Sequence, residues 1–211
     1  MCLFLTQLFV SEQKQIALMA DEKLHTQLSH RLFAINRSGM RIIMLKRFYP
    51  DRYYESAYVI DYEEFYKNGY RGIIYDVDNT LVEHGAPVTE RALELFERLH
   101  NMGYETCIIS NNSEKRVKPL ADKVKSKYVS KANKPSPVNY IKAMELMGTD
   151  RNTTFFVGDQ IFTDVWGANR AGIKSMLVKP IDKHEEIQIV LKRYLEKIVL
   201  HFYKKHVRTG K

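Results

Sequence analysis

The sequence predicts an α/β fold built on a doubly wound parallel sheet. Between residues 71 and 180, apolar runs alternate with segments whose apolar residues have helical spacing. Short apolar runs bounded by turn signals are typical of buried strands, and they lie at 72–75, 104–109, 153–157 and 174–178. Strands that alternate with helices usually run parallel, with helices on both faces of the sheet.

Capping residues and glycines place the expected helices between these strands. Thr89 and Ser136 are suitable N-cap residues for two helices, and a glycine follows the expected end of each. A third helix is expected to begin near Ser113. Pro119 should interrupt or kink it, because proline lacks the backbone N–H that a helix interior requires.

The length predicts one domain with an extension at each end. The chain has 211 residues, of which 45% are hydrophobic, enough for a sizeable core. We expect residues 1–43 to be a poorly ordered N-terminal extension and residues 44–180 to form the main domain. Its first part, 44–70, is rich in aromatic residues and should pack against the sheet. Residues 181–211 should form a basic amphipathic C-terminal helix.

Cysteine usage and hydropathy indicate a cytoplasmic protein. The two cysteines, Cys2 and Cys107, are far apart in the sequence, and Cys107 lies in an apolar run. A buried free thiol is therefore expected rather than a disulfide, which indicates a reducing compartment. No stretch approaches the roughly 20 apolar residues of a membrane-spanning helix. The N-terminal residues lack the basic region and small-residue cleavage site of a signal peptide.

The C-terminal segment concentrates positive charge. Residues 181–211 contain eight Lys or Arg and four Asp or Glu, so they carry half of the net charge of +8. Apolar residues between Ile187 and Phe202 repeat at helical spacing, and most lysines lie off that stripe. Two interpretations follow: the helix docks on the domain, or residues 184–208 lie on an anionic membrane surface. The positive charge alone would also fit nucleic acid, but nucleic acid is not the partner we favour.

Polar residues follow the expected strands at one edge of the sheet, where ligands bind in such folds. Eight residues share this placement: Asp76, Asp78, Thr80, Ser110, Asn111, Lys134, Asp159 and Asp164. Clustered carboxylates repel one another unless a cation neutralises them, and oxygen ligands favour Mg²⁺ over zinc. The sequence therefore predicts an acidic pocket that binds Mg²⁺, with a lysine nearby.

Such a pocket suits phosphoryl transfer. An aspartate can attack phosphorus and form an aspartyl-phosphate. A second carboxylate, two residues along the chain, can protonate the leaving oxygen and then deprotonate the attacking water. A lysine and a hydroxyl can hold the equatorial oxygens, where the charge of the transition state lies.

The order of these residues resembles the four motifs of the haloacid dehalogenase (HAD) superfamily. The matching residues are Asp76-Val77-Asp78-Asn79-Thr80, Ser110, Lys134 and Gly158-Asp159 with Asp164. The resemblance implies that Asp76 is the nucleophile and a metal ligand. It implies that Asp78 is the general acid and base, and that the backbone carbonyl of Asp78 coordinates the metal.

The same resemblance implies roles for the other residues. Asp159 would complete the metal site and Asp164 would support it. Ser110 and Lys134 would hold the phosphoryl group. Thr80 would orient the aspartate loop, and Asn111 would offer its backbone N–H to phosphate.

The spacing of the motifs leaves no room for a cap domain over the pocket. Fewer than 30 residues separate Thr80 from Ser110, and fewer still separate Ser110 from Lys134. An open pocket suits a phosphate carried on a protein, a nucleic-acid end or a lipid head group, because small metabolites usually need enclosure.

The stretches MLKRFYPDRYYESAYVI, DVDNTLV, SNNSEKRV and GDQIFTDVWGANRAG resemble one branch of the superfamily, the YqeG-type phosphatases of the capless IIIA class. That branch includes phosphatases that convert phosphatidylglycerophosphate to phosphatidylglycerol. The resemblance therefore implies this reaction, with the hydrolase peripheral to the inner face of the membrane. Two alternatives remain: a protein or nucleic-acid-end phosphatase of the capless class, and a non-catalytic basic module that binds membrane or nucleic acid. Asp76 and Asp78 are both present, which counts against the second.

Overall fold

The computed structural model describes residues 45–182 and 187–208. The chain divides into two compact units after Leu45, and every element below belongs to the second unit, Lys46–Lys211. The extension expected at residues 1–43 lies outside the described residues.

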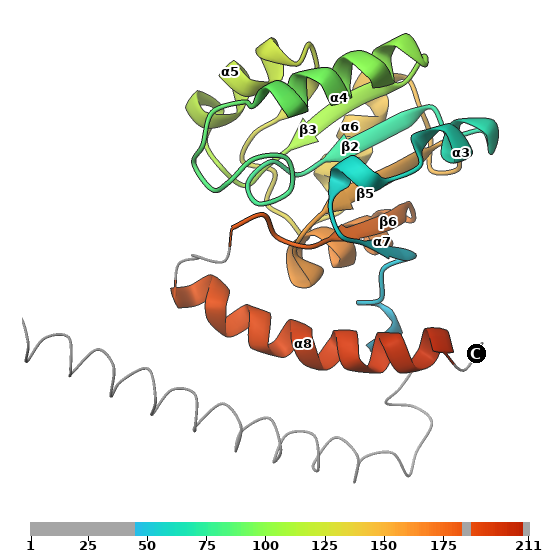
Figure 1. Cartoon of the computed structure of the whole chain (residues 1–211), viewed down its shortest axis with the longest axis vertical. Coiled ribbons are helices and arrows are strands. Elements are labelled where there is room, and N and C mark those ends of the chain that lie inside the picture. The colour runs from blue at the N-terminus through green and yellow to red at the C-terminus, as the bar shows by residue number, and fades with distance from the viewer. Residues whose placement is uncertain (1–44, 183–186, 209–211) are drawn as a thin grey trace, which may run out of the picture. The chain divides into compact units, whose positions relative to one another are not determined.

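Six parallel strands form one sheet in the order β1-β6-β5-β2-β3-β4 (Figure 1). The strands are β1 (Arg52–Tyr54), β2 (Gly72–Tyr75), β3 (Glu105–Ile109), β4 (Lys127–Val129), β5 (Thr154–Gly158) and β6 (Lys174–Val178). After β2, the chain adds β3 and β4 on one side and then β5 and β6 on the other, which is a doubly wound arrangement. The predicted α/β fold is confirmed.

The sequence pattern predicts the four inner strands within one residue at each end, but not the edge strands β1 and β4. Each edge strand has only three residues, and each has exposed or half-buried side chains. An edge strand has one neighbour and less covering, so its residues need not form an apolar run. The edges of this sheet are therefore set by pairing rather than by composition.

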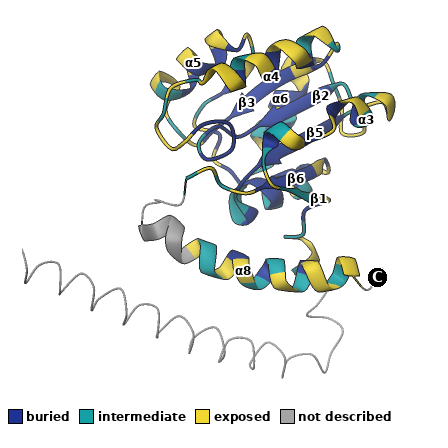
Figure 2. Ribbon diagram, in the orientation of Figure 1, coloured by how far each residue is buried: buried dark blue, intermediate teal, exposed yellow. Residues whose placement is uncertain are grey.

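Helices cover both faces of the sheet. They are α3 (Tyr62–Lys67), α4 (Glu90–Asn101), α5 (Glu114–Lys123), α6 (Val138–Met147) and α7 (Trp166–Ala171), with the short elements η1 (Ala57–Val59) and η2 (Ile161–Val165). A further helix, α8 (Ile187–Arg208), packs against η2. One apolar cluster joins α3, α4 and α5 to the sheet, and a second joins α6 and α7 to it. Figure 2 shows the strands buried between these layers. Alternate residues of β2 enter different clusters, because side chains alternate across a strand.

The caps of the helices partly follow the prediction. Thr89 caps α4, since its side chain accepts a hydrogen bond from the Ala92 N–H. Ser136 does not cap α6, because Pro137 occupies the N-cap position. The Ser136 N–H donates to the carbonyl oxygen of Asn133, so Ser136 belongs to the preceding turn.

The interruption expected at Pro119 does not occur. α5 begins after Ser113 and continues through Pro119. Val117 and Leu120 on this helix are buried in the core. This packing compensates for the single hydrogen bond that proline cannot donate, because tertiary contacts supply most helical stability.

The described residues contain no cap domain over the carboxyl ends of the strands. α4 and β3 fill the interval from Thr80 to Ser110, and α5 and β4 fill the interval from Ser110 to Lys134. The capless architecture is therefore confirmed.

Aromatic side chains from the segment 44–70 pack on one face of the sheet. The rings of Phe65 and Tyr62 stack on Phe155 of β5, with centroids 4.7 and 6.3 Å away. Tyr70 meets the same ring edge-on at 5.5 Å. These contacts attach the segment before β2 to the centre of the sheet.

The C-terminal helix that the sequence predicts is present as α8. It packs on the domain through buried Glu196, Val199 and Tyr203, and Tyr203 meets the ring of Tyr49 edge-on at 5.6 Å. The side chains of residues 187–191 lie outside the described part. Among the helices that the structure describes, none is both long and apolar enough to span a membrane.

Candidate active site

Strand register brings the carboxyl ends of three strands to one edge of the sheet. Tyr75, the last residue of β2, lies opposite Ile108 of β3 and Val157 of β5. Asp76 therefore begins its loop beside both neighbours, and its N–H donates to the Val157 carbonyl oxygen at 2.9 Å. The β2–β5 pair is also where strand addition changes sides, and ligands bind at such a switch point.

Three buried aspartates meet at this edge. One carboxylate oxygen from each of Asp76, Asp159 and Asp164 lies within 4.8 Å of the others. Asp76 follows β2, Asp159 follows β5, and Asp164 lies in η2. Asp164 can approach β5 because residue 158 is glycine: a Cβ on Gly158 would lie 2.6 Å from Asp164 Oδ2. The three residues are named below as the aspartate cluster.

Lys134 lies against this cluster. Its Nζ donates to Asp76 Oδ1 at 2.5 Å and to Asp164 Oδ1 at 2.7 Å, and its side chain is only 4% exposed. The Lys134 N–H donates to Asn111 Oδ1 at 2.7 Å, and Asn111 Nδ2 donates to the Lys134 carbonyl at 3.3 Å. The Asn111 side chain therefore holds the loop that carries the lysine, a contact that the sequence pattern does not reveal.

The two hydroxyl residues lie close to the same edge. Thr80 Oγ1 donates to Asp159 Oδ1 at 3.2 Å, so Thr80 contacts the cluster directly. Ser110 is buried at the end of β3, and its Oγ accepts from the Asn112 N–H at 3.2 Å. The structure thus brings both predicted hydroxyls to the carboxyl ends of the strands.

Asp78 is held apart from the aspartate cluster. Its carboxylate accepts hydrogen bonds from Gly85 N–H at 2.8 Å, Asn112 Nδ2 at 2.7 Å and Arg116 Nη2 at 2.7 Å. The motifs in the sequence assign no role to Asn112 or Arg116. Both lie in the stretch SNNSEKRV next to Ser110, and that position is the only signal the sequence offers for them.

Two residues of α8 also reach the site. Arg193 Nη2 donates to Asp159 Oδ2, and its Nη1 donates to the Asp159 carbonyl oxygen at 2.7 Å. Glu196 accepts from Arg193 at 2.9 Å and from the Ile161 N–H at 2.7 Å. Sequence reasoning places Arg193 among the basic residues of the tail, because no motif links it to Asp159.

Burial makes the clustered carboxylates hard to ionise. Loss of solvation raises the pKa of Asp76 to about 7, while Lys134 opposes the rise and Asp164 adds to it. Burial also raises the pKa of Asp159 well above its usual range, against the effect of Arg193. Burial alone would lower the pKa of Lys134, but the carboxylates of Asp164 and Asp76 raise it, so the lysine stays charged.

The aspartate cluster fits a hard divalent cation. All of its donors are carboxylate oxygens, which hard cations prefer. Among the described residues, Lys134 and Arg193 form the ion pairs with the cluster, so three carboxylates face two cations. A divalent cation would supply the missing positive charge.

Comparison with known proteins gives a family for this site. A model of haloacid dehalogenase-like hydrolases matches residues 78–172. The chain is 35% identical over 159 residues to a Bacillus subtilis (strain 168) protein named "Probable phosphatase YqeG", and the match covers 74% of this chain and 92% of that protein. It is 25% identical over 167 residues to the Arabidopsis thaliana chloroplastic/mitochondrial phosphatidylglycerophosphate phosphatase 1, covering 72% of this chain and 46% of that protein.

Solved structures of phosphatases are also similar to this chain. One is the cobalt-bound deoxy-D-mannose-octulosonate 8-phosphate phosphatase of Haemophilus influenzae, with a TM-score of 0.42 and 12% identity, covering 65% of this chain and 91% of that one. Another is a HAD phosphatase from Thermococcus onnurineus, with a TM-score of 0.40 and 21% identity, covering 47% and 50% of the two chains.

The match to the Bacillus protein extends over most of both chains. Hydrolases of the matched family use a divalent metal, and the aspartate cluster supplies suitable ligands. The chain therefore belongs to the haloacid dehalogenase-like hydrolases and is a phosphomonoester phosphatase of the YqeG family.

Proposed function

We propose that the protein is a Mg²⁺-dependent phosphatase that works through an aspartyl-phosphate on Asp76 and acts on phosphatidylglycerophosphate at a membrane surface. One observation carries the chemistry: two carboxylates two residues apart have different surroundings. Asp76 lies buried in the aspartate cluster beside Lys134, whereas Asp78 is held by Arg116 outside it. Carboxylates in contrasting environments can take different roles in one reaction.

In the first step, a carboxylate oxygen of Asp76 attacks phosphorus, and the bond from phosphorus to the leaving oxygen breaks. Asp78 gives its proton to that oxygen, which leaves as an alcohol. In the second step, Asp78 takes a proton from water as the water oxygen attacks phosphorus. This step restores Asp76 and releases inorganic phosphate. The Gly85 N–H, Asn112 and Arg116 hold the Asp78 carboxyl in position for both transfers.

The other predicted residues hold the phosphoryl group and the metal. Lys134, Ser110 and the Asn111 N–H would bind phosphoryl oxygens, because cations and hydrogen-bond donors stabilise the charge of the transition state. The aspartate cluster, with the Asp78 carbonyl, would hold Mg²⁺. A bound Mg²⁺ would offset the charge of the phosphate oxygens.

The substrate proposal rests on three features. The absence of a cap among the described residues leaves room for a phosphate on a large or membrane-held group. A relative that matches over 46% of its own length is named a phosphatidylglycerophosphate phosphatase. The third feature is the set of exposed side chains on α8.

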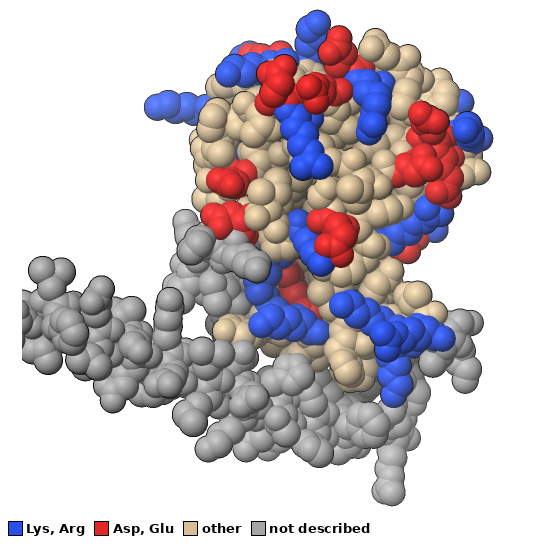
Figure 3. Space-filling model, in the orientation of Figure 1, with Lys and Arg blue, Asp and Glu red and all other residues tan. Residues whose placement is uncertain are grey.

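These side chains of α8 include both apolar and basic groups. Leu195 and Val207 are 48% and 59% exposed, and Lys192, Lys204 and Arg208 on the same helix are exposed as well. On the face shown in Figure 3, Lys and Arg gather toward the α8 end, while both signs of charge mix elsewhere. Apolar residues flanked by cations suit a helix that lies on anionic lipid.

A phosphate-release assay tests the proposal. The panel contains phosphatidylglycerophosphate in anionic vesicles, a phosphopeptide and a 5′-phosphorylated oligonucleotide, each with Mg²⁺ and with EDTA. We expect fastest release from the lipid, loss of release in EDTA, and no turnover by Asp76→Asn. Preference for the peptide or oligonucleotide would refute the lipid assignment alone. Normal turnover by Asp76→Asn would refute the mechanism, and vesicle binding without release from any substrate would favour a non-catalytic module.

A further inference from the structure

Arg193 contacts the aspartate cluster from a helix outside the segment that the family model matches, 78–172. Two of its nitrogens donate to Asp159, one to the carboxylate and one to the carbonyl oxygen. The Arg193 side chain is 16% exposed, and the Asp159 carboxylate is fully buried. A guanidinium therefore lies directly against one of the three carboxylates that fit a metal.

Glu196, one turn further along α8, bridges Arg193 and the turn η2. One of its oxygens accepts from Arg193 at 2.9 Å, and the other accepts from the Ile161 N–H at 2.7 Å. Ile161 is the first residue of η2, the turn that contains Asp164. Through Arg193 and Glu196, α8 is attached to the positions of two of the three clustered aspartates.

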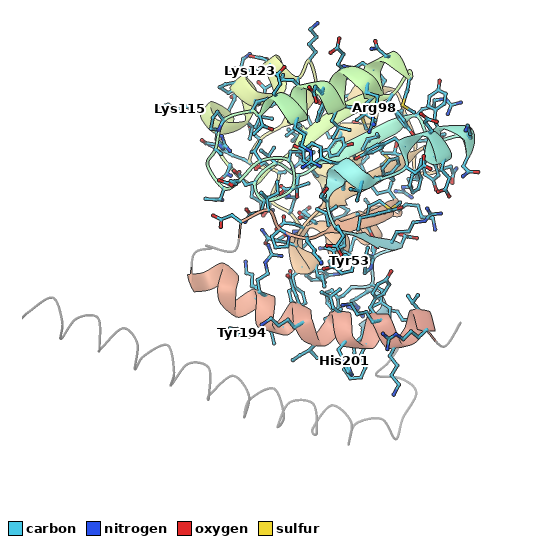
Figure 4. All side chains as sticks on the ribbon, in the orientation of Figure 1. Tyr53, Arg98, Lys115, Lys123, Tyr194 and His201 are labelled. Carbon is cyan, nitrogen blue, oxygen red and sulfur yellow. The ribbon has the colours of Figure 1, made fainter. Side chains whose placement is uncertain are left out.

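A cavity lies beside these contacts. It has a volume of about 430 Å³ and lies between α8 and the strands β1 and β6, where Tyr53, Leu177 and Leu200 line it. Tyr194 of α8 lines the cavity as well, and Figure 4 labels both tyrosines. Arg193 and Glu196 also line this cavity, so their polar contacts lie at its edge.

We propose that Arg193 is a counter-ion that acts through Asp159 to set the divalent-cation affinity of the aspartate cluster, so that cation binding and the docking of α8 oppose each other. Among the described residues, Lys134 and Arg193 form the ion pairs with this cluster. A divalent cation brings two positive charges to the same carboxylates, repels Arg193 and competes with it for Asp159. Linkage then requires that docking weakens cation binding as much as the cation weakens docking.

Calorimetric titration of the full chain with Mn²⁺, near pH 7.5, tests the proposal without turnover. Arg193→Gln should bind Mn²⁺ at least about tenfold more tightly than the wild type, because it loses a nearby positive charge. Arg193→Lys keeps the charge and should bind like the wild type. Unchanged or weaker binding by Arg193→Gln would overturn the proposal.

Lys197→Gln is the matched control. It removes the same charge one turn along α8, where Lys197 lies over the ring of Tyr194 at 4.6 Å. We expect less than about a twofold change in its Mn²⁺ affinity, because solvent and salt screen a charge at the surface. A change as large as that of Arg193→Gln would mean that net charge alone acts, and would contradict the specific role of Arg193.

Hydrogen exchange on the wild type provides a measurement that needs no variant. When Mn²⁺ saturates the protein, amides of residues 192–208 should exchange faster, because a weakened Arg193–Asp159 contact lets α8 open more often. Equal or slower exchange would overturn the proposal even if Arg193→Gln did not fold.

The inference rests on the proposed function only in treating the aspartate cluster as a metal site, and the two can fail separately. If the wild type binds no Mn²⁺, both the metal site and the inference fail. If the wild type binds Mn²⁺ and hydrolyses phosphatidylglycerophosphate, but residue 193 does not affect the affinity, only the inference fails.

Discussion

Replacing Asp76 by asparagine should stabilise the metal-free protein at neutral pH, although it removes the proposed nucleophile. Asp76 is buried, and its pKa is raised from 3.8 to about 7, mainly through lost solvation. A carboxyl group with a raised folded-state pKa stabilises the fold while it is protonated. That stabilisation is complete below the unfolded-state pKa and is lost as pH rises through the folded-state pKa, here between about pH 4 and 7.

The size of the effect follows from the change in pKa. The rise from 3.8 to about 7, at about 1.4 kcal/mol per pKa unit, amounts to about 4 kcal/mol. At pH 8 the ionised Asp76 should therefore lower the unfolding free energy by up to about 4 kcal/mol relative to a neutral side chain of similar shape. The asparagine of Asp76→Asn is such a side chain, and near pH 4 the variant and the wild type should differ little.

Urea unfolding in EDTA at a series of pH values, followed by circular dichroism, measures this difference. In EDTA, the unfolding free energy of Asp76→Asn should exceed that of the wild type by a margin that grows as pH rises. In a separate series with saturating Mg²⁺, this difference should be smaller, because the metal stabilises the wild type. Asp122→Asn is the control, because Asp122 is 57% exposed in a surface pair with Lys118. If Asp76→Asn were less stable than the wild type at pH 8 in EDTA, the burial argument for Asp76 would be wrong.

Three further predictions follow from the site and from α8. Asp78→Asn should retain the fold and lower turnover by at least about a hundredfold, the usual size of a general acid–base contribution; near-normal kcat would contradict its role. Lys134→Met should lower the unfolding free energy at pH 8 by about 3 kcal/mol, because it leaves buried carboxylates unpaired, whereas exposed Lys118→Met should cost under about 1 kcal/mol; equal losses would contradict this difference. Lys192→Glu with Arg208→Glu should weaken sedimentation with anionic vesicles at least about tenfold without changing hydrolysis of a soluble phosphomonoester; unchanged sedimentation would exclude α8 as the membrane contact.

The structure bears on the two interpretations of the C-terminal helix that the sequence leaves open. Glu196, Val199 and Tyr203 are buried, so one stripe of the helix docks on the domain. Leu195 and Val207 nevertheless remain exposed to solvent. A helix can therefore dock on its own domain and still present apolar and basic groups outward, and the membrane contact stays a prediction for the vesicle assay.

The order of the chain already determines the main sheet and most of the site. Buried parallel strands need continuous apolar runs, so β2, β3, β5 and β6 are visible in the sequence. Parallel strands also place their carboxyl ends at one edge, which is why residues that follow separate strands, such as Asp76, Ser110 and Asp159, are expected to lie together on the sequence alone. The spacing between motifs likewise excludes a cap.

Tertiary structure decided what depends on contacts between distant segments. The edge strands β1 and β4 are too short and too exposed to form an apolar pattern, so only pairing defines them. The separation of Asp78 from the aspartate cluster depends on Arg116, and the hold on the Lys134 loop depends on the side chain of Asn111. Arg193 reaches Asp159 because α8 returns to the ends of the strands. Local composition records propensity and burial, whereas such contacts depend on where the fold brings distant residues together.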